Sequence, residues 1–147
     1  MKKIALICVM CLFALTMRAQ KCAVLDFQLG TNVSAEETEY ISSNFRLNFY
    51  PVKYQRIETD KIHEIIKGFG YDKNNMTPQQ LLEVGRRLEA NYIVVGHLGK
   101  QMGEYIFDVR VIDVSTGVTV DSESGNFQQS EYRAAAKTIA LRLAYRM

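Results

Sequence analysis

The stretch NYIVVGHLGKQMGEYIFDVRVIDVSTG, from Asn91 to Gly117, decides the fold because it sets two apolar runs on either side of a short glycine-containing segment. The first run, Asn91–Leu98, is apolar at successive positions, which is typical of a central strand covered on both faces. The second run, Glu104–Val114, mostly alternates apolar and polar residues, as strands with a period of two do. Lys100–Gly103 between them predicts the turn of a hairpin.

The glycines of this stretch do not have the arrangement of a phosphate-binding loop. Such a loop needs glycines between the end of a strand and the start of a helix, so that free backbone N–H groups face the anion. Gly96 and Gly99 are followed by another strand instead, and their spacing matches neither a P-loop nor a dinucleotide-binding motif. We therefore expect Gly96 to be a close-packing or bulge position within a strand.

Two capping boxes predict where helices begin. Ser34 with Glu37 begins a helix that Pro51 ends, and Thr77 with Gln80 begins another, with Pro78 at its first helical position. The other expected elements are strands over Cys22–Phe27, Val52–Ile57 and Val118–Ser124, a helix capped by Thr59 or Asp60, and a last helix from Ser130. The buried stripes of the four helices are Ile41, Phe45, Asn48 and Phe49; Ile62, Ile65, Ile66 and Phe69; Leu81, Leu82, Gly85 and Leu88; and Tyr132, Ala136, Ile139, Ala140 and Leu143.

The order of these elements is β-α-β-α-α-β-β-β-α. It predicts a single α/β domain in which a mixed five-stranded sheet carries packed helices. We expect Gly85 to let its helix approach the sheet closely. No internal repeat or low-complexity linker interrupts the pattern.

The first residues, MKKIALICVMCLFALTMRAQ, are typical of a secretory signal peptide. Lys2 and Lys3 precede an apolar run that is too short and wrongly flanked for a transmembrane span. We expect residues 1–19 to be removed near Ala19/Gln20, leaving residues 20–147 as one domain without a transmembrane segment. The predicted location is the periplasm, with outer-membrane association as an open alternative.

Charge argues against a nucleic-acid partner. The formal charge of +2 falls by three, to −1, once Lys2, Lys3 and Arg18 are removed with the signal peptide. A near-neutral domain without a block of Lys or Arg lacks the electrostatic footprint that binding to phosphates requires.

Cysteine usage excludes an internal disulfide in the mature chain, because Cys8 and Cys11 leave with the signal peptide and Cys22 remains alone. A cysteine close to a signal peptide is also where bacterial lipoproteins are acylated. Here Lys21 is not the small residue that the peptidase needs, and the strand pattern follows at once without a flexible tether. We expect Cys22 to be unlipidated, as either a buried or an intermolecularly paired strand cysteine.

The two histidines do not form a recognisable site. His63 shares a helix face with Asp60 and Lys67, and His97 lies within the central strand. Because the spacing marks no third ligand and no nucleophile, we assign no metal, cofactor or catalytic residue.

Four aspartates could still supply acid–base chemistry if two of them met at a sheet end. Asp113 opens a hairpin and Asp26 closes a strand, positions where Asp commonly accepts from nearby backbone N–H groups. The spacing does not show that any two converge. The four aspartates are Asp26, Asp108, Asp113 and Asp121.

Tyrosine is frequent in a chain without tryptophan, and tyrosine is enriched in interface hot spots. The alternative is that each ring covers the edge of the core with its hydroxyl in water. The tyrosines are Tyr40, Tyr50, Tyr54, Tyr71, Tyr92, Tyr105, Tyr132 and Tyr145.

Three segments together resemble a known envelope domain: CAVLDFQLGTNVSAEETEYISSNFR, KYQRIETDKIHEIIKGFGY and TPQQLLEVGRRLEANYIVVGHLGKQMGEYIFDVRVIDVSTGVTVDSESG. The resemblance is to the superfamily that contains the curli-assembly protein CsgG, the penicillin-binding-protein activator LpoB and the N-terminal domain of TolB. It implies a non-catalytic, protein-binding α/β domain of the Gram-negative envelope. The strand hairpins are too short to span a bilayer as CsgG-like hairpins do, and neither a tether nor a propeller is expected.

The leading hypothesis is therefore a soluble periplasmic adaptor that binds another envelope protein through a sheet edge or a tyrosine-bearing face. The resemblance to CsgG makes self-association into a ring or dimer plausible. The rival hypothesis is a small-molecule or glycan-binding protein, or a hydrolase, with a site at the sheet ends near Asp26, His97 and Asp113. A concave pocket that holds these three residues would favour the rival, and a flat apolar patch would favour the adaptor.

Overall fold

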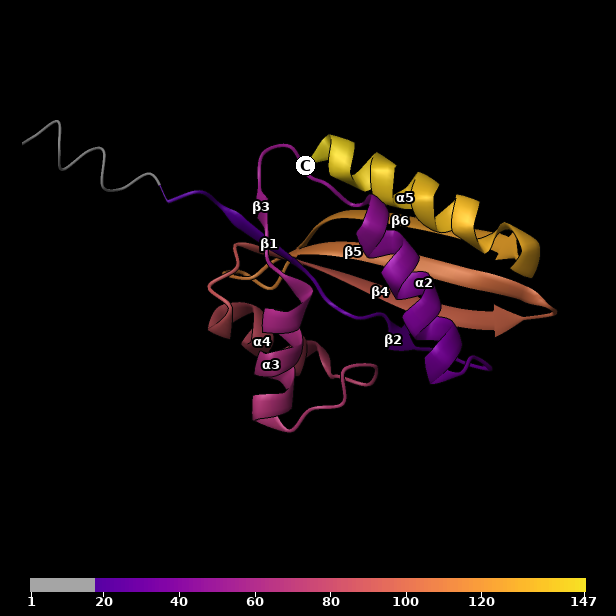
Figure 1. Ribbon diagram of the computed structural model, residues 1–147, viewed down its shortest axis with the longest axis horizontal. Helices are drawn as coiled ribbons and strands as arrows, with labels where there is room; N and C mark the ends of the chain where they lie inside the picture. The colour runs from indigo at the N-terminus through magenta and orange to yellow at the C-terminus, as the bar shows by residue number, and fades with distance from the viewer. Residues whose placement is uncertain (1–17) are drawn as a thin grey trace, which may run out of the picture.

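The computed structural model describes residues 18–147 (Figure 1). The predicted signal peptide lies outside the described residues except for Arg18 and Ala19. The elements are β1 (Lys21–Val24), β2 (Gln28–Leu29), α2 (Ala35–Asn48), β3 (Gln55–Arg56), α3 (Thr59–Phe69), α4 (Pro78–Arg87), β4 (Tyr92–Gln101), β5 (Glu104–Asp113), β6 (Thr119–Gln128), a 3₁₀ turn (Gln129–Glu131) and α5 (Tyr132–Arg146). Across residues 18–147, no helix combines the length and apolarity that crossing a bilayer requires.

The sheet has the strand order β3-β1-β4-β5-β6, and the short β2 also pairs with β4. β1 runs parallel to β3 and β4, whereas β4, β5 and β6 form an antiparallel meander. β4 is central because it pairs with β1 and β2 on one side and with β5 on the other. The predicted α/β domain with a mixed sheet is confirmed, with β2 as one additional strand.

Helices cover both faces of the sheet (Figure 1). α2 and α5 enclose one core with β4, β5 and β6, in which Phe27, Phe45 and Phe107 are fully buried. α3 and α4 enclose a second core over Ala23 and Ile93 on the opposite face. Both predicted capping boxes are present, at Ser34 and at Thr77.

Two predicted strands are shorter than the sequence suggested. The strand over Cys22–Phe27 breaks after Val24, because the side chain of Asp26 turns into a buried polar cluster. The prediction of a strand over Val52–Ile57 is wrong for its first half, because β3 begins only at Gln55. Lys21 at the start of β1 is opposite Gln55, so the residues before Gln55 have no strand to pair with, and Val52 is 89% exposed.

Smaller corrections concern β6 and α3. β6 runs to Gln128 rather than Ser124, because the first residues of β5, beginning with Glu104 opposite Gln128, pair with its last residues. Phe69 is not in the buried stripe of α3. It is the last residue of that helix, is 37% exposed and stacks on Tyr71 with ring centroids 5.1 Å apart.

Two glycines are close-packing positions, as predicted. A Cβ atom on Gly96 would lie 2.4 Å from the ring of Phe27, and one on Gly85 would lie 2.9 Å from Cγ2 of Ile93. Real side chains do not approach so closely. Both glycines therefore fix the separation between the central strand and the layer that covers it.

Cys22 is a free, fully buried cysteine of β1. Burial raises the pKa of its thiol to about 12, and the nearby charge of Arg56 only partly opposes this rise. The buried alternative from the sequence is therefore the one observed.

Cys22 should resist thiol reagents in the folded protein, because only an exposed thiolate reacts quickly. We expect residues 20–147 to give no reaction with Ellman's reagent at mildly alkaline pH, and to titrate one thiol in concentrated guanidinium chloride. Rapid labelling of the folded protein would contradict the burial of β1.

Candidate functional site

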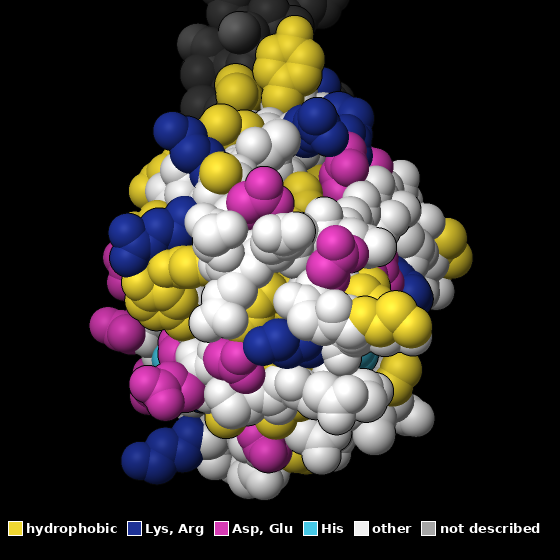
Figure 2. All heavy atoms as spheres, turned by 90° about the vertical axis from the view of Figure 1, so that its right-hand side faces the viewer, with side chains coloured by type: hydrophobic (Ala, Val, Ile, Leu, Met, Phe, Trp, Pro, Cys, Tyr) yellow, Lys and Arg dark blue, Asp and Glu magenta, His cyan; other side chains and the backbone are white. Residues whose placement is uncertain are grey.

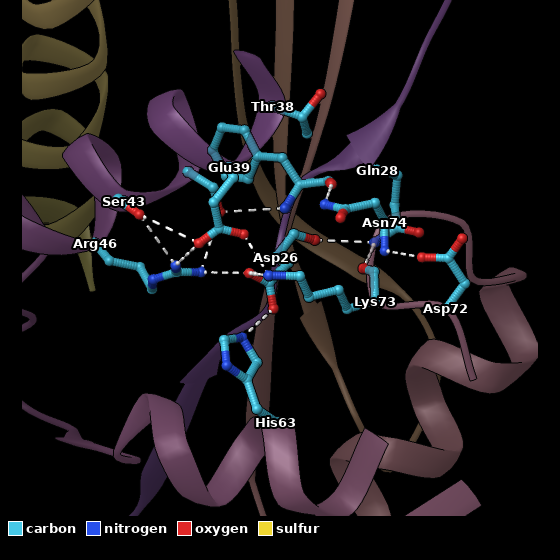
Figure 3. A network of polar contacts seen from close by, with 12 residues as sticks. Asp26, Gln28, Thr38, Glu39, Ser43, Arg46, His63, Asp72, Lys73 and Asn74 are labelled. Carbon is cyan, nitrogen blue, oxygen red and sulfur yellow. Dashed lines mark hydrogen bonds and ion pairs between the residues drawn. The ribbon is translucent and has the colours of Figure 1, made fainter. Parts of the chain in front are cut away.

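The most prominent polar feature is a set of five charged or titratable side chains around the buried Asp26, here called the Asp26 cluster (Figure 3). Its members are Asp26, Glu39, Arg46, His63 and Lys73. Its members come from the segment after β1, from α2, from α3 and from the loop between α3 and α4. The cluster therefore joins four parts of the chain that are distant in sequence.

Asp26 lies at the centre and is completely buried. Its Oδ1 accepts from Nη1 of Arg46 at 2.9 Å, and its Oδ2 lies 2.6 Å from Nε2 of His63. The ammonium of Lys73 is 3.9 Å from Oδ1. A buried carboxylate needs such partners, because an unpaired charge is strongly disfavoured in the protein interior.

Glu39 closes the cluster on its outer side. Its carboxylate accepts from Nη2 of Arg46 at 3.2 Å and from the ammonium of Lys73. Burial alone would raise the pKa of Glu39. The hydrogen bond and charge of Lys73, with the charges of Arg46 and His63, outweigh burial and hold this pKa below its ordinary value. Two carboxylates thus face two permanent cations and a histidine.

Uncharged side chains complete the surroundings of the cluster. Oγ of Ser42 accepts from the backbone N–H of Phe27 at 3.3 Å and from Nη1 of Arg46 at 3.1 Å. Gln28 donates to the carbonyls of Asp26 and Lys73, both at 2.9 Å, and so ties the break after β1 to the loop before α4. In residues 18–147 every buried side-chain nitrogen or oxygen has a hydrogen-bond partner.

An Asp–His pair can act as a general base when the imidazole reaches a nucleophile. His63 is one-third exposed, but its only hydrogen bond among the described residues is with Asp26. The hydroxyls of the cluster, Ser42 and Ser43, accept from Arg46 instead. Within the described range, no three His, Cys, Asp or Glu side chains are placed to hold a metal ion. The contacts are those of an ion-pair network that joins elements of the fold.

The structure does not bring together the three residues of the rival hypothesis. Asp113 is opposite Tyr92 at the start of β4, whereas His97 is opposite Asp108. Those two positions are five residues apart, roughly 17 Å along a strand. Asp26 faces Arg46 and His63 instead of either of them.

Asp113 has the role expected from the sequence and Asp26 does not. The carboxylate of Asp113 accepts from the backbone N–H groups of Ser115 and Thr116 at 2.8 and 3.2 Å. The hydrogen bond from the hydroxyl of Ser115 is the main cause of its lowered pKa. Asp26 was expected to bond nearby backbone N–H groups, but its oxygens bind side chains from α2 and α3.

His97 lines a separate hollow of about 440 Å³ beside the start of β5. Gly30, Asn32, Ile106 and Asp108 line the same hollow. Figure 2 views the end of the molecule that carries the β4–β5 turn, and uncharged polar groups occupy much of it, with single hydrophobic and charged side chains between them. No extended patch of one kind is visible on this face.

A different end of the molecule carries an apolar surface, here called the α5-end patch, formed by Tyr50, Val52, Leu141 and Tyr145. These side chains are 62%, 89%, 50% and 89% exposed and line a shallow hollow of about 730 Å³. Arg142 and Arg146 lie at its rim. Exposed apolar groups gathered in this way are a recognised mark of an interaction surface.

The last feature is the free edge of the sheet along β6. β6 pairs only with β5, so the backbone groups of a ten-residue strand face outward on its other side. β6 contains no Lys, Arg or Pro. Its two carboxylates are held by Arg146, which lies 2.9 Å from Asp121 and 2.6 Å from Glu123, and the hydrogen bond from Arg146 is the main cause of the lowered pKa of Asp121.

No protein-family model matches the sequence, and no curated protein matches it. Solved structures do. The chain superposes on the LpoB C-terminal domain from Salmonella enterica with a TM-score of 0.55 and 16% identity, covering 78% of this chain and 87% of that one. Lipoprotein GNA1162 from Neisseria meningitidis gives a TM-score of 0.61 and 11% identity, covering 76% and 81%.

TolB from Acinetobacter baumannii also matches, with a TM-score of 0.53 and 13% identity over 86% of this chain but only 28% of TolB. The chain therefore corresponds to one part of TolB. At these identities the likeness concerns the fold alone, which this chain shares with the LpoB C-terminal domain that the sequence resembled.

Proposed function

We propose that the protein is an exported, non-catalytic envelope protein that acts as an adaptor by binding another envelope protein along the β6 edge. The fold supports this proposal, because it is shared with the LpoB C-terminal domain and with a lipoprotein. The predicted signal peptide supports export. The main observation behind the proposal is that the outer edge of β6 pairs with no described strand and that β6 contains no lysine, arginine or proline.

Sheet edges invite pairing with another chain, and proteins usually block them with lysine, proline, bulges or a covering element. β6 is long enough to pair with a full extended segment. Its single register irregularity lies opposite Val111 and Ile112, near its beginning, so Asp121–Gln128 continues in regular register. An extended segment of a partner would gain backbone hydrogen bonds there.

The side chains of β6 also suit such pairing. Ser122, Ser124 and Asn126 are exposed on the face opposite α5, and none of them is charged or bulky. Because Arg146 neutralises Asp121 and Glu123 on the α5 face, an approaching strand would not meet two free negative charges.

Lysines placed on β6 should abolish this interaction. The variant Ser122→Lys/Ser124→Lys adds two gatekeeper charges to exposed positions, and we expect it to retain a partner at least about tenfold less well than wild type. The measurement is cross-linking and affinity capture of residues 20–147 from the envelope fraction, with quantitative mass spectrometry of the proteins retained.

Thr138→Lys is a control for added charge, because Thr138 is an exposed residue of α5 and not of β6. It should retain the partner as wild type does. Thermal unfolding of all three proteins checks that each is folded. Equal capture by wild type and the β6 variant would contradict the proposed surface, and recovery of the protein alone would contradict the adaptor role.

A further inference from the structure

We infer that the α5-end patch is a second interaction surface that docks on an anionic lipid membrane. This inference is independent of the β6 edge. It rests on the composition, shape and charge of Tyr50, Val52, Leu141 and Tyr145 and of the basic residues around them.

The patch consists of protruding rather than enclosed side chains. Val52 and Tyr145 are each 89% exposed, and the hollow between them is shallow. A closed pocket would select one side chain of a protein partner, whereas protruding tyrosine, valine and leucine side chains suit the boundary between water and acyl chains. Tyrosine is favoured at that boundary because its ring is apolar and its hydroxyl is polar.

The charges around the patch are mostly uncompensated. Lys53, Arg56 and Arg142 form no ion pair with any residue in the described part of the chain. The guanidinium of Arg56 lies 4.8 Å from the ring centroid of Tyr50 and donates to the carbonyls of Arg46 and Phe49, so it is held beside the patch without an acidic partner.

Not every basic residue of the described chain is free in this way. Arg146, at the rim of the same patch, is paired with Asp121 and Glu123, and Lys73 is paired with Glu39. Free cations next to exposed apolar groups complement lipid headgroups of negative charge above buried acyl chains.

The patch also lies close to where the chain enters the described fold. The backbone N–H of Gln55 donates to the carbonyl of Gln20 at 2.9 Å, and Val52 is three residues before Gln55. In Figure 1 the end of α5 and the loop before β3 lie beside each other, away from the β4–β5 turn.

The test is co-sedimentation of residues 20–147 with vesicles of phosphatidylethanolamine and phosphatidylglycerol, compared with vesicles of phosphatidylcholine alone. We expect binding to the anionic vesicles that weakens as salt is added. Val52→Asp/Tyr145→Asp should partition about tenfold less, and Arg142→Glu should also lose binding.

Met102→Asp is the matched control, because Met102 is 96% exposed on the β4–β5 turn, at a distance from the patch. It should bind the vesicles as wild type does. Equal binding by the wild type and the patch variants would overturn the inference, as would no binding by wild type at low salt. Loss of a captured envelope protein by the patch variants, with vesicle binding unchanged, would assign the patch to a protein partner and also overturn it.

Discussion

Replacing Arg46 with leucine should lower the free energy of unfolding by about 3–5 kcal/mol. The substitution removes the cation that lies 2.9 Å from Asp26 and leaves that fully buried carboxylate with only His63 and the more distant Lys73. It also removes the donor that bridges to Glu39 on the same helix. Equilibrium unfolding in urea, followed by circular dichroism, measures the change.

Arg142→Leu is the control, because Arg142 is an exposed arginine of α5 without an ion pair among the described residues. It should change stability by no more than about 0.5 kcal/mol. Combining Asp26→Asn with Arg46→Leu should cost less than the sum of the two single changes, since the pair is then removed together. Additive costs, or a cost of Arg46→Leu within about 0.5 kcal/mol, would show that the Asp26 cluster does not hold the fold together.

Gly96→Ala should lower the free energy of unfolding by about 1–3 kcal/mol, the usual cost of overpacking a core. The new Cβ would lie 2.4 Å from the Phe27 ring. That ring cannot move aside easily, because it packs against Phe45 and Phe107 with centroid separations of 5.3 and 5.1 Å. Urea unfolding again provides the measurement.

Gly68→Ala makes the same chemical change with the opposite expected sign. Gly68 lies within α3 and a Cβ there would meet no atom within 4 Å, so alanine should stabilise the protein by about 0.5–1 kcal/mol. If Gly96→Ala were as well tolerated as Gly68→Ala, the close contact between β4 and Phe27 would be wrong. A companion change, Phe27→Leu, should recover part of the loss in Gly96→Ala by freeing space.

Features set by neighbouring residues could be predicted from the sequence. The hairpin after Leu98, the capping boxes at Ser34 and Thr77, and the turn contacts of Asp113 all depend on groups within a few residues of each other. The role of Gly96 was also predictable, because a glycine in an apolar strand has few explanations other than close packing or a bulge.

Features set by distant residues could not be predicted. Arg46 and His63 are 20 and 37 residues from Asp26 in sequence, and nothing in their local patterns marks them as partners. The burial of Arg46, a charged residue that follows Phe45 on α2, is seen only in the structure. The predicted ends of the strands were wrong for a related reason, since the length of β3 depends on where β1 begins.

In the proposed adaptor, the parts that stabilise the fold and the parts that bind are separate. The Asp26 cluster joins β1 to α2, α3 and the following loop, which fixes the sheet on which the remaining strands are built. The β6 edge and the α5-end patch lie outside that cluster, and their exposed side chains are not packed in the core. Adaptor function on this fold would therefore depend on exposed strand and helix residues rather than on a buried reacting group.

The most direct test of the proposed adaptor function is photo-cross-linking in living cells with benzoylphenylalanine at Ser124 on the β6 edge, compared with the same probe at Thr138 on α5. The account predicts a discrete product from Ser124 that contains a second envelope protein, and little or none from Thr138. Products from Thr138 but not from Ser124 would contradict it.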